Sequence, residues 1–233
     1  MTSRGNGPRL VVFDFDNTLY GGDSGTQLVA WLICQAWWRM LGAALISPLV
    51  APLWCCAGTR RRAISTYLWI GTVGLAPDTM TSMVDRYATP QLERLRSRLR
   101  PEGMEALAAH RDAGDHVVVV TGTPVELVNT LLAADSSDPV RVVGSTSRRY
   151  LGGLILERHC YGAHKLAMLY DGGYTAPLAI AYSDNPADLP LLARAIRPIV
   201  VNPRASRVAA FQRVLGVDVE IQNWKQPSPR IHK

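Results

Sequence analysis

The sequence predicts an α/β fold, a mostly parallel β-sheet covered by helices, with a long helical insertion after its first strand. From residue 101 onward, short runs of β-branched residues alternate with segments of helical periodicity, which is typical of such a sheet. An earlier apolar run, Leu10–Phe13, is separated from this alternation by residues 23–100, which carry apolar and helical patterns only. The 233 residues can bury a full core as one domain with an insertion.

The first predicted strand, Leu10–Phe13, delivers Asp14 and Asp16 at its carboxyl end, with Thr18 just beyond. In an open parallel sheet, ligands bind at that edge. Two acids so close together repel each other unless a cation or a proton lies between them. The opening stretch therefore predicts a ligand site that needs a counter-charge.

Residues 27–59 are strongly apolar, with Arg39 as their one charge, and the uncharged stretch 40–59 has transmembrane length. Pro48 and Pro52 argue against one straight helix. Tryptophans within the region and the cluster Arg60–Arg62 after it are typical of membrane interfaces. We therefore expect membrane association.

The apolar segment cannot make a single crossing if later residues complete a site with Asp14, because the two halves of the site would then lie on opposite sides of the bilayer. We expect a hairpin broken around Pro48 and Pro52, with both ends cytoplasmic. The alternative is a buried pair of core helices. Residues 63–100 then predict further helices, and the arginine-rich run 93–100 is a solvated helix face or, alternatively, a lipid contact.

The remaining elements follow from periodicity and from glycine and proline breaks. We expect a hairpin within Tyr150–Leu156 and a frayed tail over Gln222–Lys233. Strands are predicted over 117–120, 141–144, 178–182 and 199–201, and helices over 101–113, 124–134, 164–170, from 186, and over 204–214.

The chain is basic, with a net charge of +6 that arginine supplies almost entirely. Such a surplus suits nucleic acid, anionic lipid or phosphorylated substrates. No zinc-finger spacing, helix-turn-helix pattern or aromatic-plus-basic RNA motif is present, so we expect no nucleic-acid partner. We expect reduced, buried thiols in a cytosolic setting and, without a signal-peptide apolar region, no export; the cysteines are Cys34, Cys55, Cys56 and Cys160.

The turn after the second predicted strand reads Thr121-Gly122-Thr123-Pro124. Thr123, Pro124 and Glu126 fit the N-cap, N1 and N3 positions of a capping box. A helix N-terminus directly after Thr121 would be an anion site, because its free N–H groups and dipole favour negative charge. A plain helix cap is the alternative.

Another predicted strand ends at Asp184, followed by a helix start with Asn185 as N-cap, Pro186 at N1 and Asp188 at N3. An acid facing Asp14 would be costly without a cation, and Mg²⁺ prefers few carboxylates together with water and phosphate oxygens. Lys165, the one lysine before the C-terminal tail, would balance the remaining negative charge.

The ordered set Asp14-x-Asp16-x-Thr18, Thr121-Gly122, Lys165 and Asp184-x-x-x-Asp188 resembles the haloacid dehalogenase superfamily, over residues 9–202. The long insertion is similar to that of its subfamily IB, the phosphoserine-phosphatase-like group. The resemblance implies a Rossmannoid parallel sheet with an inserted α-helical (C1-type) cap. The core would comprise 1–22 and 101–222, the cap 23–100 with a membrane-associating segment at 27–59, and the tail 223–233.

The resemblance also implies a Mg²⁺-dependent phosphomonoester hydrolase. Asp14 would attack phosphorus and form an aspartyl-phosphate, and Asp16 would be the general acid and then the general base. Mg²⁺ would bind Asp14, the backbone carbonyl of Asp16, and Asp184. Asp188 would orient Lys165 or a water at the metal. Phosphate and substrate contacts would come from Thr18, Asp23, Thr121, Gly122 and Lys165.

Two further sequence resemblances bear on the identity of the substrate. Asp23 stands nine positions after Asp14, where phosphoserine phosphatases carry a longer glutamate. The apolar run, Gly58–Ala63, Tyr150–Gly153 and Cys160–Lys165 are more similar to the phosphatidylglycerophosphatase C family, although Asn17 stands where glycine is common. That likeness implies a phospholipid head group such as phosphatidylglycerophosphate, hydrolysed at the cytoplasmic face of the membrane. The alternatives are a soluble small-metabolite phosphatase acting on phosphoserine, and a non-catalytic membrane-surface binding module.

Overall fold

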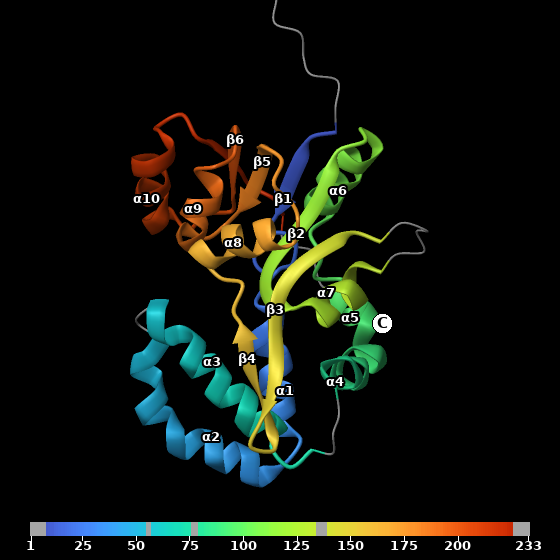
Figure 1. Cartoon of the computed structure of the whole chain (residues 1–233), viewed down its shortest axis with the longest axis vertical. Coiled ribbons are helices and arrows are strands. Elements are labelled where there is room, and N and C mark those ends of the chain that lie inside the picture. Colours follow the sequence, from blue (N-terminus) through green and yellow to red (C-terminus); the bar gives the residue numbers. More distant parts are fainter. Residues whose placement is uncertain (1–7, 55–56, 76–78, 134–138, 226–233) are drawn as a thin grey trace, which may run out of the picture.

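The computed structural model describes residues 8–54, 57–75, 79–133 and 139–225. Its centre is a seven-stranded sheet in the order β4-β3-β2-β1-β5-β6-β7, so the first strand lies in the middle (Figure 1). Neighbouring strands are parallel except for β3 and β4, which form an antiparallel hairpin. The strands are β1 Leu10–Phe13, β2 His116–Pro124, β3 Arg141–Tyr150, β4 Gly153–Arg158, β5 Leu178–Ser183, β6 Arg197–Val201 and β7 Glu220–Gln222.

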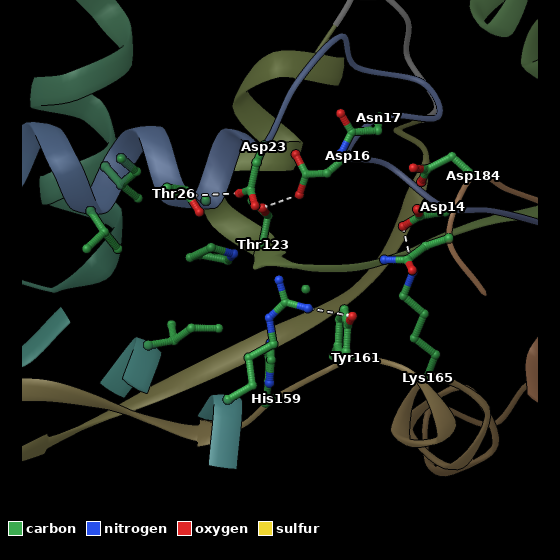
Figure 2. Close-up of a pocket in the computed structure, with 18 of the residues that line it drawn as sticks. Asp14, Asp16, Asn17, Asp23, Thr26, Thr123, His159, Tyr161, Lys165 and Asp184 are labelled. Carbon is green, nitrogen blue, oxygen red and sulfur yellow. Dashed lines mark hydrogen bonds and ion pairs between the residues drawn. The ribbon is translucent and has the colours of Figure 1, made fainter. Parts of the chain in front are cut away.

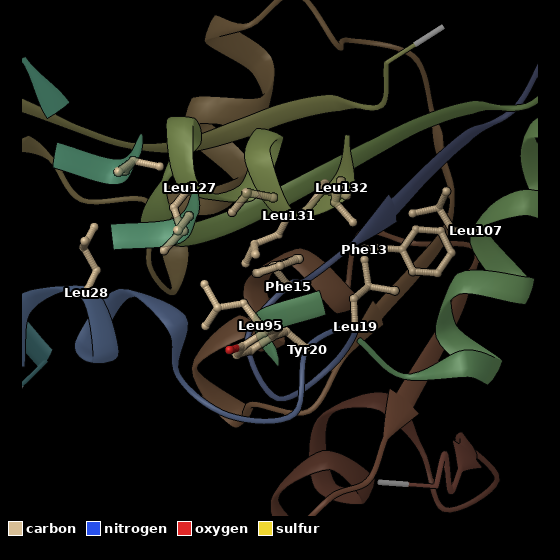
Figure 3. Close-up of a cluster of buried hydrophobic side chains, with 14 of the residues drawn as sticks. Phe13, Phe15, Leu19, Tyr20, Leu28, Leu95, Leu107, Leu127, Leu131 and Leu132 are labelled. Carbon is tan, nitrogen blue, oxygen red and sulfur yellow. The ribbon is translucent and has the colours of Figure 1, made fainter. Parts of the chain in front are cut away.

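Helices cover both faces of this sheet, because alternate residues of the central strands point to opposite sides. Val11 and Phe13 of β1 belong to one buried cluster, together with leucines of α6 and α7 (Figure 3). Leu10 and Val12 belong to a second cluster on the other face, together with side chains of α8, α9 and α10. These helices are α6 Pro101–Asp112, α7 Val125–Leu132, α8 Ala163–Asp171, α9 Leu189–Leu192 and α10 Ala205–Leu215.

The insertion between β1 and α6 is helical, as expected. Its elements are α1 Ser24–Cys34, α2 Trp37–Val50, the 3₁₀ turn η1 Ala51–Trp54, α3 Ala57–Thr72, α4 Met80–Ala88, the 3₁₀ turn η2 Thr89–Gln91 and α5 Leu92–Arg96. Helices α2 and α3 lie side by side and form a hairpin at the edge of the molecule (Figure 1). Helix α2 continues through Pro48, so the first break comes at Val50. Within the described residues, no single helix combines the length and the hydropathy that a membrane crossing requires.

The β3–β4 hairpin supports α3 directly. The indole N–H of Trp69 donates to the carbonyl of Tyr150 at 3.0 Å, and the Leu154 N–H donates to the Thr72 hydroxyl at 2.8 Å. Gly153 lies so close to α3 that a Cβ there would be 2.7 Å from the ring of Trp69. The insertion is therefore fastened to the β3–β4 hairpin through α3, and α1 also contacts β2.

Three sequence-based predictions about local structure need correction. The frayed tail is wrong for residues 222–225: Gln222 ends β7, and Trp224 is buried with its N–H donating to Asn202 Oδ1. The indole fills the space beside Gly103, where a Cβ would lie 2.8 Å from the ring, and residues 226–233 lie outside the described part.

The predicted strands were also too short for β2 and β3, because polar residues beyond the apolar runs continue the backbone ladder. Of the thiols predicted to be buried, Cys160 is buried but Cys34 is exposed at the end of α1, and Cys55 and Cys56 are not described.

Candidate active site

Asp14 and Asp184 follow the central strands β1 and β5, which are hydrogen-bonded neighbours, so the two carboxylates meet at the same sheet edge. The Thr18 hydroxyl lies between them, 3.3 Å from Asp14 Oδ2 and 3.4 Å from Asp184 Oδ1. The Asp184 N–H donates to this hydroxyl at 3.1 Å. A hydroxyl has one proton, so Thr18 can serve only one of the two carboxylates at a time.

Lys165, on α8, joins the nucleophile candidate to the fourth acid of the motif set. Its Nζ lies 2.6 Å from Asp14 Oδ1 and 2.7 Å from Asp188 Oδ2, and all three side chains are buried (Figure 2 shows the pair with Asp14). The Ser183 hydroxyl donates to the same Asp188 oxygen, while the other oxygen, Oδ1, is buried with no hydrogen-bond partner in the described structure. Asp188 is thus the second ion-pair partner of Lys165.

The electrostatics of this cluster leave a deficit of positive charge. Burial raises the pKa of Asp14 well above its usual value; Lys165 opposes the shift, and Asp188 and Asp184 add to it. Burial also raises the pKa of Asp184 to about 6. For Lys165, burial lowers the pKa, but Asp14 and Asp188 together raise it by more than burial lowers it. The amine therefore stays charged. One lysine against three carboxylates makes a second cation favourable.

The Asp16 carboxylate is directed away from this cluster, toward the start of α1 and the end of β2 (Figure 2). Its Oδ1 accepts from the Ser24 N–H at 2.7 Å and from the Ser24 hydroxyl at 2.6 Å. Its Oδ2 accepts from the Thr123 hydroxyl at 2.6 Å. Burial raises the pKa of Asp16 to about 6, and Asp23 adds to the shift, whereas the bonds from Ser24 and Thr123 oppose it.

The predicted capping box at Thr123 is therefore wrong. Thr123 belongs to β2, its hydroxyl serves Asp16, and α7 begins after Pro124 without a side-chain cap. The Thr123 hydroxyl donates instead to a carboxylate more than one hundred positions earlier, a partner that local sequence spacing does not reveal. Ser24 was likewise missed, although its place just after Asp23 and before the apolar helix was a usable signal.

The other predicted site residues lie around these acids. Gly122 lines the cavity in front of Asp14, but Thr121 and Thr18 are fully buried and do not line it; Thr121 Oγ1 accepts from the Thr123 N–H. Asp23 lines the cavity and is also the N-cap of α1, accepting from the Thr26 N–H at 2.8 Å. Asn17 has a positive φ of 61°, the left-handed conformation that glycine and asparagine adopt most readily.

A cavity of about 920 Å³ opens from Asp14, Asp16 and Asp184 toward the insertion. On the insertion side its wall is mainly apolar and comes from α1, α3 and β4: Leu28, Val29, Ala30, Ile33, Ile64, Leu68 and Leu156. The cavity therefore has an acidic floor and an apolar wall.

A cationic and aromatic group borders the cavity between floor and wall. Arg60 Nη1 donates to the Tyr161 hydroxyl at 2.6 Å, and its guanidinium also lies over the Tyr161 ring (Figure 2). The His159 ring stacks on Tyr161 with centroids 5.4 Å apart. Burial lowers the pKa of His159 to about 4, with Arg60 adding to the shift, so at neutral pH this imidazole is uncharged.

Asp14 and Asp184 are the residues that fit a metal ion. Both line the cavity, share the single Thr18 proton, and have pKa values raised by burial in the absence of a further cation. Across the described ranges there is no cluster of three or more His, Cys, Asp or Glu side chains suited to a metal. Two carboxylates agree with the preference of Mg²⁺ for few protein ligands plus water and phosphate oxygens.

A mostly parallel α/β sheet with acids, a lysine and hydroxyl side chains gathered at its carboxyl edge defines a protein of the Rossmann-like class with a ligand site at that edge. The chain belongs to the haloacid dehalogenase-like hydrolase family, whose model matches residues 11–193.

Individual proteins and solved structures are similar to this chain over most of its length. Protein CicA of Caulobacter vibrioides is 29% identical over 196 residues, which cover 81% of this chain and 84% of the relative. A structure of a protein of unknown function from Bordetella pertussis matches with a TM-score of 0.70 and 19% identity, covering 92% of this chain and 97% of that one. A probable phosphoserine phosphatase from Vibrio cholerae matches with a TM-score of 0.57 and 16% identity, covering 88% and 59%. At these identities the structures show that the fold is shared.

Proposed function

We propose that the protein is a Mg²⁺-dependent phosphomonoester hydrolase that works through an aspartyl-phosphate on Asp14. The observation that carries this proposal is the buried Asp14–Lys165–Asp188 arrangement, beside Asp184 and at the floor of an open cavity. A carboxylate held by a lysine at such a place is suited to nucleophilic attack on a phosphoryl group.

The reaction would follow from the positions of the side chains. An Asp14 carboxylate oxygen attacks phosphorus, the bond to the leaving oxygen breaks, and Asp16 gives that oxygen its proton. Asp16 then takes a proton from the water that attacks the aspartyl-phosphate, which releases inorganic phosphate and restores Asp14. Lys165 and the Gly122 N–H would hold phosphoryl oxygens. Asp14 and Asp184 would hold Mg²⁺, which supplies positive charge to the phosphoryl oxygens when bound.

Magnesium is expected to stabilise the fold more at pH 7.5 than at pH 5. The raised pKa of Asp184 means that this metal-binding carboxyl group favours the metal-free fold below about pH 4 and loses that contribution as pH rises through about 6. At pH 7.5 the ionised carboxylates are free to bind the metal, whereas at pH 5 protons compete. Mg²⁺ at one hundred times its dissociation constant should raise the free energy of unfolding by about 2.7 kcal/mol at pH 7.5. The same Mg²⁺ concentration should raise it by less than half as much at pH 5. Thermal unfolding with and without Mg²⁺, at equal ionic strength, measures both.

Comparing the stabilisation that Mg²⁺ adds at pH 7.5 with the stabilisation that it adds at pH 5 also removes an opposing effect of pH that does not depend on the metal. His159 has a lowered pKa, so its contribution to stability rises between about pH 4 and 6.5, but it does so with or without metal. Asp184→Asn should lose most of the increment at pH 7.5. An increment that is equal at both pH values, or that survives Asp184→Asn, would contradict a metal site on these acids.

For the substrate, we propose a phospholipid head group such as phosphatidylglycerophosphate. Two features support it. The apolar wall of the cavity begins beside Arg60, so a phosphodiester and the start of an acyl-bearing group could follow the reacting phosphate. In addition, α2 exposes an apolar surface: six of the thirteen exposed large hydrophobic side chains of the described residues belong to it, namely Trp37, Trp38, Met40, Leu41, Leu45 and Leu49.

This α2 surface is suited to a bilayer. Leu45 and Leu49 are 71% and 76% exposed, whereas such side chains are normally buried in a soluble protein. No acidic residue occurs from Ser24 to Pro77 in the sequence, and Arg60–Arg62 follow α2, so anionic lipid would be attracted and not repelled. We therefore place the protein peripherally at the cytoplasmic face of the cell membrane.

Phosphate release from phosphatidylglycerophosphate in anionic vesicles and from free phosphoserine, measured side by side with Mg²⁺, tests the substrate. A kcat/KM that favours the lipid supports the proposal. A preference for phosphoserine would favour the small-metabolite phosphatase. If the protein hydrolyses neither of these esters and also fails to hydrolyse p-nitrophenyl phosphate, the non-catalytic binding module would be favoured.

Replacing Leu45 and Leu49 by serine is expected to lower kcat/KM for the vesicle-borne lipid about 30- to 150-fold, because roughly 2–3 kcal/mol of apolar insertion is lost. Turnover of soluble p-nitrophenyl phosphate should not change, since neither residue lines the cavity. The matched control replaces two exposed apolar residues elsewhere, Ile196 and Val217, by serine. Equal lipid turnover in both double variants would argue against membrane binding through α2.

A further inference from the structure

The Asp16 carboxylate is held by two hydroxyl residues from distant parts of the chain, Ser24 at the start of α1 and Thr123 at the end of β2. We infer that Ser24 and Thr123 are positioning residues, which hold the Asp16 carboxyl group at the orientation needed for proton transfer to the leaving oxygen. The inference rests on the proposed function, because it concerns the proton step of that reaction.

Three hydrogen-bond donors restrict the orientation of the Asp16 carboxyl group. Oδ1 of Asp16 receives two donors from Ser24, the N–H at 2.7 Å and the hydroxyl at 2.6 Å, and Oδ2 receives the Thr123 hydroxyl at 2.6 Å. The two hydroxyl oxygens are themselves 3.2 Å apart. With donors on both oxygens, rotation of the carboxyl group would break at least one short bond, so its plane and direction are fixed (Figure 2 labels Asp16 and Thr123).

Ser24 and Thr123 are buried, and Thr123 is closely packed. Ser24 and Thr123 are each 2% exposed. Gly25 packs so closely on Thr123 that a Cβ there would lie 2.8 Å from the Thr123 hydroxyl oxygen, and a Cβ on Gly144 would lie 2.7 Å from the Thr123 carbonyl oxygen. The hydroxyl of Thr123 is therefore fixed by packing as well as by its bond to Asp16.

Ser24 is not needed as a helix cap, which is the usual reason for a serine at this place. Asp23 is the N-cap of α1 and accepts from the Thr26 N–H. The hydroxyl and N–H of Ser24 are thus available to Asp16, and the first residue of α1 becomes part of the proton-transfer arrangement.

A positioning role and a merely structural role predict different substrate dependence. Expulsion of an alkyl alcohol needs proton donation in the transition state, whereas p-nitrophenolate leaves readily without it. If Ser24 and Thr123 orient Asp16, their loss will slow hydrolysis of alkyl phosphates selectively. If they only fasten α1 to β2, hydrolysis of both kinds of ester will fall together.

The experiment measures kcat/KM of the full chain with Mg²⁺ for n-butyl phosphate and p-nitrophenyl phosphate. For Ser24→Ala with Thr123→Val we expect a fall of about 100-fold for the alkyl ester and less than about threefold for the aryl ester. Thr123→Ser keeps a hydroxyl and should recover most of the alkyl rate when Ser24 is intact. Thr130→Val is the matched control, because the Thr130 hydroxyl donates within α7 to the Glu126 carbonyl, and it should change neither rate.

Equal falls for the two esters, or no fall for the alkyl ester, would overturn the inference. Asp14→Asn separates this result from a failure of the proposed function. If that variant hydrolyses both esters at the parent rate, the aspartyl-phosphate reaction itself is refuted and the inference falls with it. If Asp14→Asn is inactive while the Ser24 and Thr123 variants lack selectivity, only the positioning role fails. Thermal unfolding of each variant identifies any rate loss that comes from misfolding.

Discussion

Replacing Asp14 by asparagine is expected to reduce phosphate release by about 10⁴-fold or more, because the nucleophile is lost while the shape of the site is kept. Asp14 is 4% exposed, and Lys165 is held against its carboxylate by a 2.6 Å ion pair. The amide cannot form the acyl phosphate. Inorganic phosphate release with p-nitrophenyl phosphate and Mg²⁺ measures the loss, and acid-stable labelling by ³²P-phosphoryl substrate, absent in the variant, identifies the intermediate.

The matched control for this change is Asp218→Asn, since Asp218 is an exposed acid remote from the site. It should retain the parent rate. Asp184→Asn should also lower the rate of phosphate release strongly. In this variant a high Mg²⁺ concentration should restore part of the rate, because the substitution weakens metal binding and leaves the nucleophile in place. Phosphate release by Asp14→Asn at the parent rate would refute the catalytic assignment.

Replacing Lys165 by methionine is expected to have the largest effect on stability, about 3–5 kcal/mol of unfolding free energy. The amine is the shared partner of Asp14 and Asp188, which are both buried. Removing it leaves two uncompensated carboxylates, each of which must either protonate or draw in water. Activity should be lost as well. Urea unfolding at pH 7.5 without Mg²⁺ measures the change in the free energy of unfolding directly.

A second variant keeps this prediction falsifiable. Lys165→Met combined with Asp188→Asn removes one of the stranded charges, so it should recover part of the lost stability, with a coupling energy of about 1–3 kcal/mol. Lys225→Met, at an exposed lysine, is the control and should change stability by less than about 0.5 kcal/mol. Loss of less than 1 kcal/mol in Lys165→Met would mean that the ion pairs are not formed in solution.

The cluster of acids and lysine at the candidate site could be predicted from the sequence because each member stands directly after a strand or at the start of a helix. Asp14 and Asp184 follow apolar runs that are readily recognised as buried parallel strands, and parallel strands bring such ends to one edge. Lys165 was found by charge balance. These residues follow from local patterns plus one rule of topology.

The surroundings of Asp16 could not be predicted in the same way. Whether the hydroxyl of Thr123 caps α7 or binds Asp16 depends on where α1 starts relative to β2, which is a tertiary distance and not a spacing along the chain. The same limit applies to Trp224, whose burial depends on a gap beside Gly103. The apolar run around α2 indicated either burial or a membrane; in the structure one face packs on α3 and the other is exposed.

The attachment of α3 to the β3–β4 hairpin has a consequence for how this protein can be altered or can diverge. Segments about eighty positions apart share hydrogen bonds and a close glycine contact, so the insertion is not a self-contained module that can be excised or exchanged. A chimaera that receives a different insertion would leave the edge of the hairpin unpaired, and one that receives a different hairpin would leave Trp69 without its carbonyl partners. Changes on either side of this junction must therefore be inherited together.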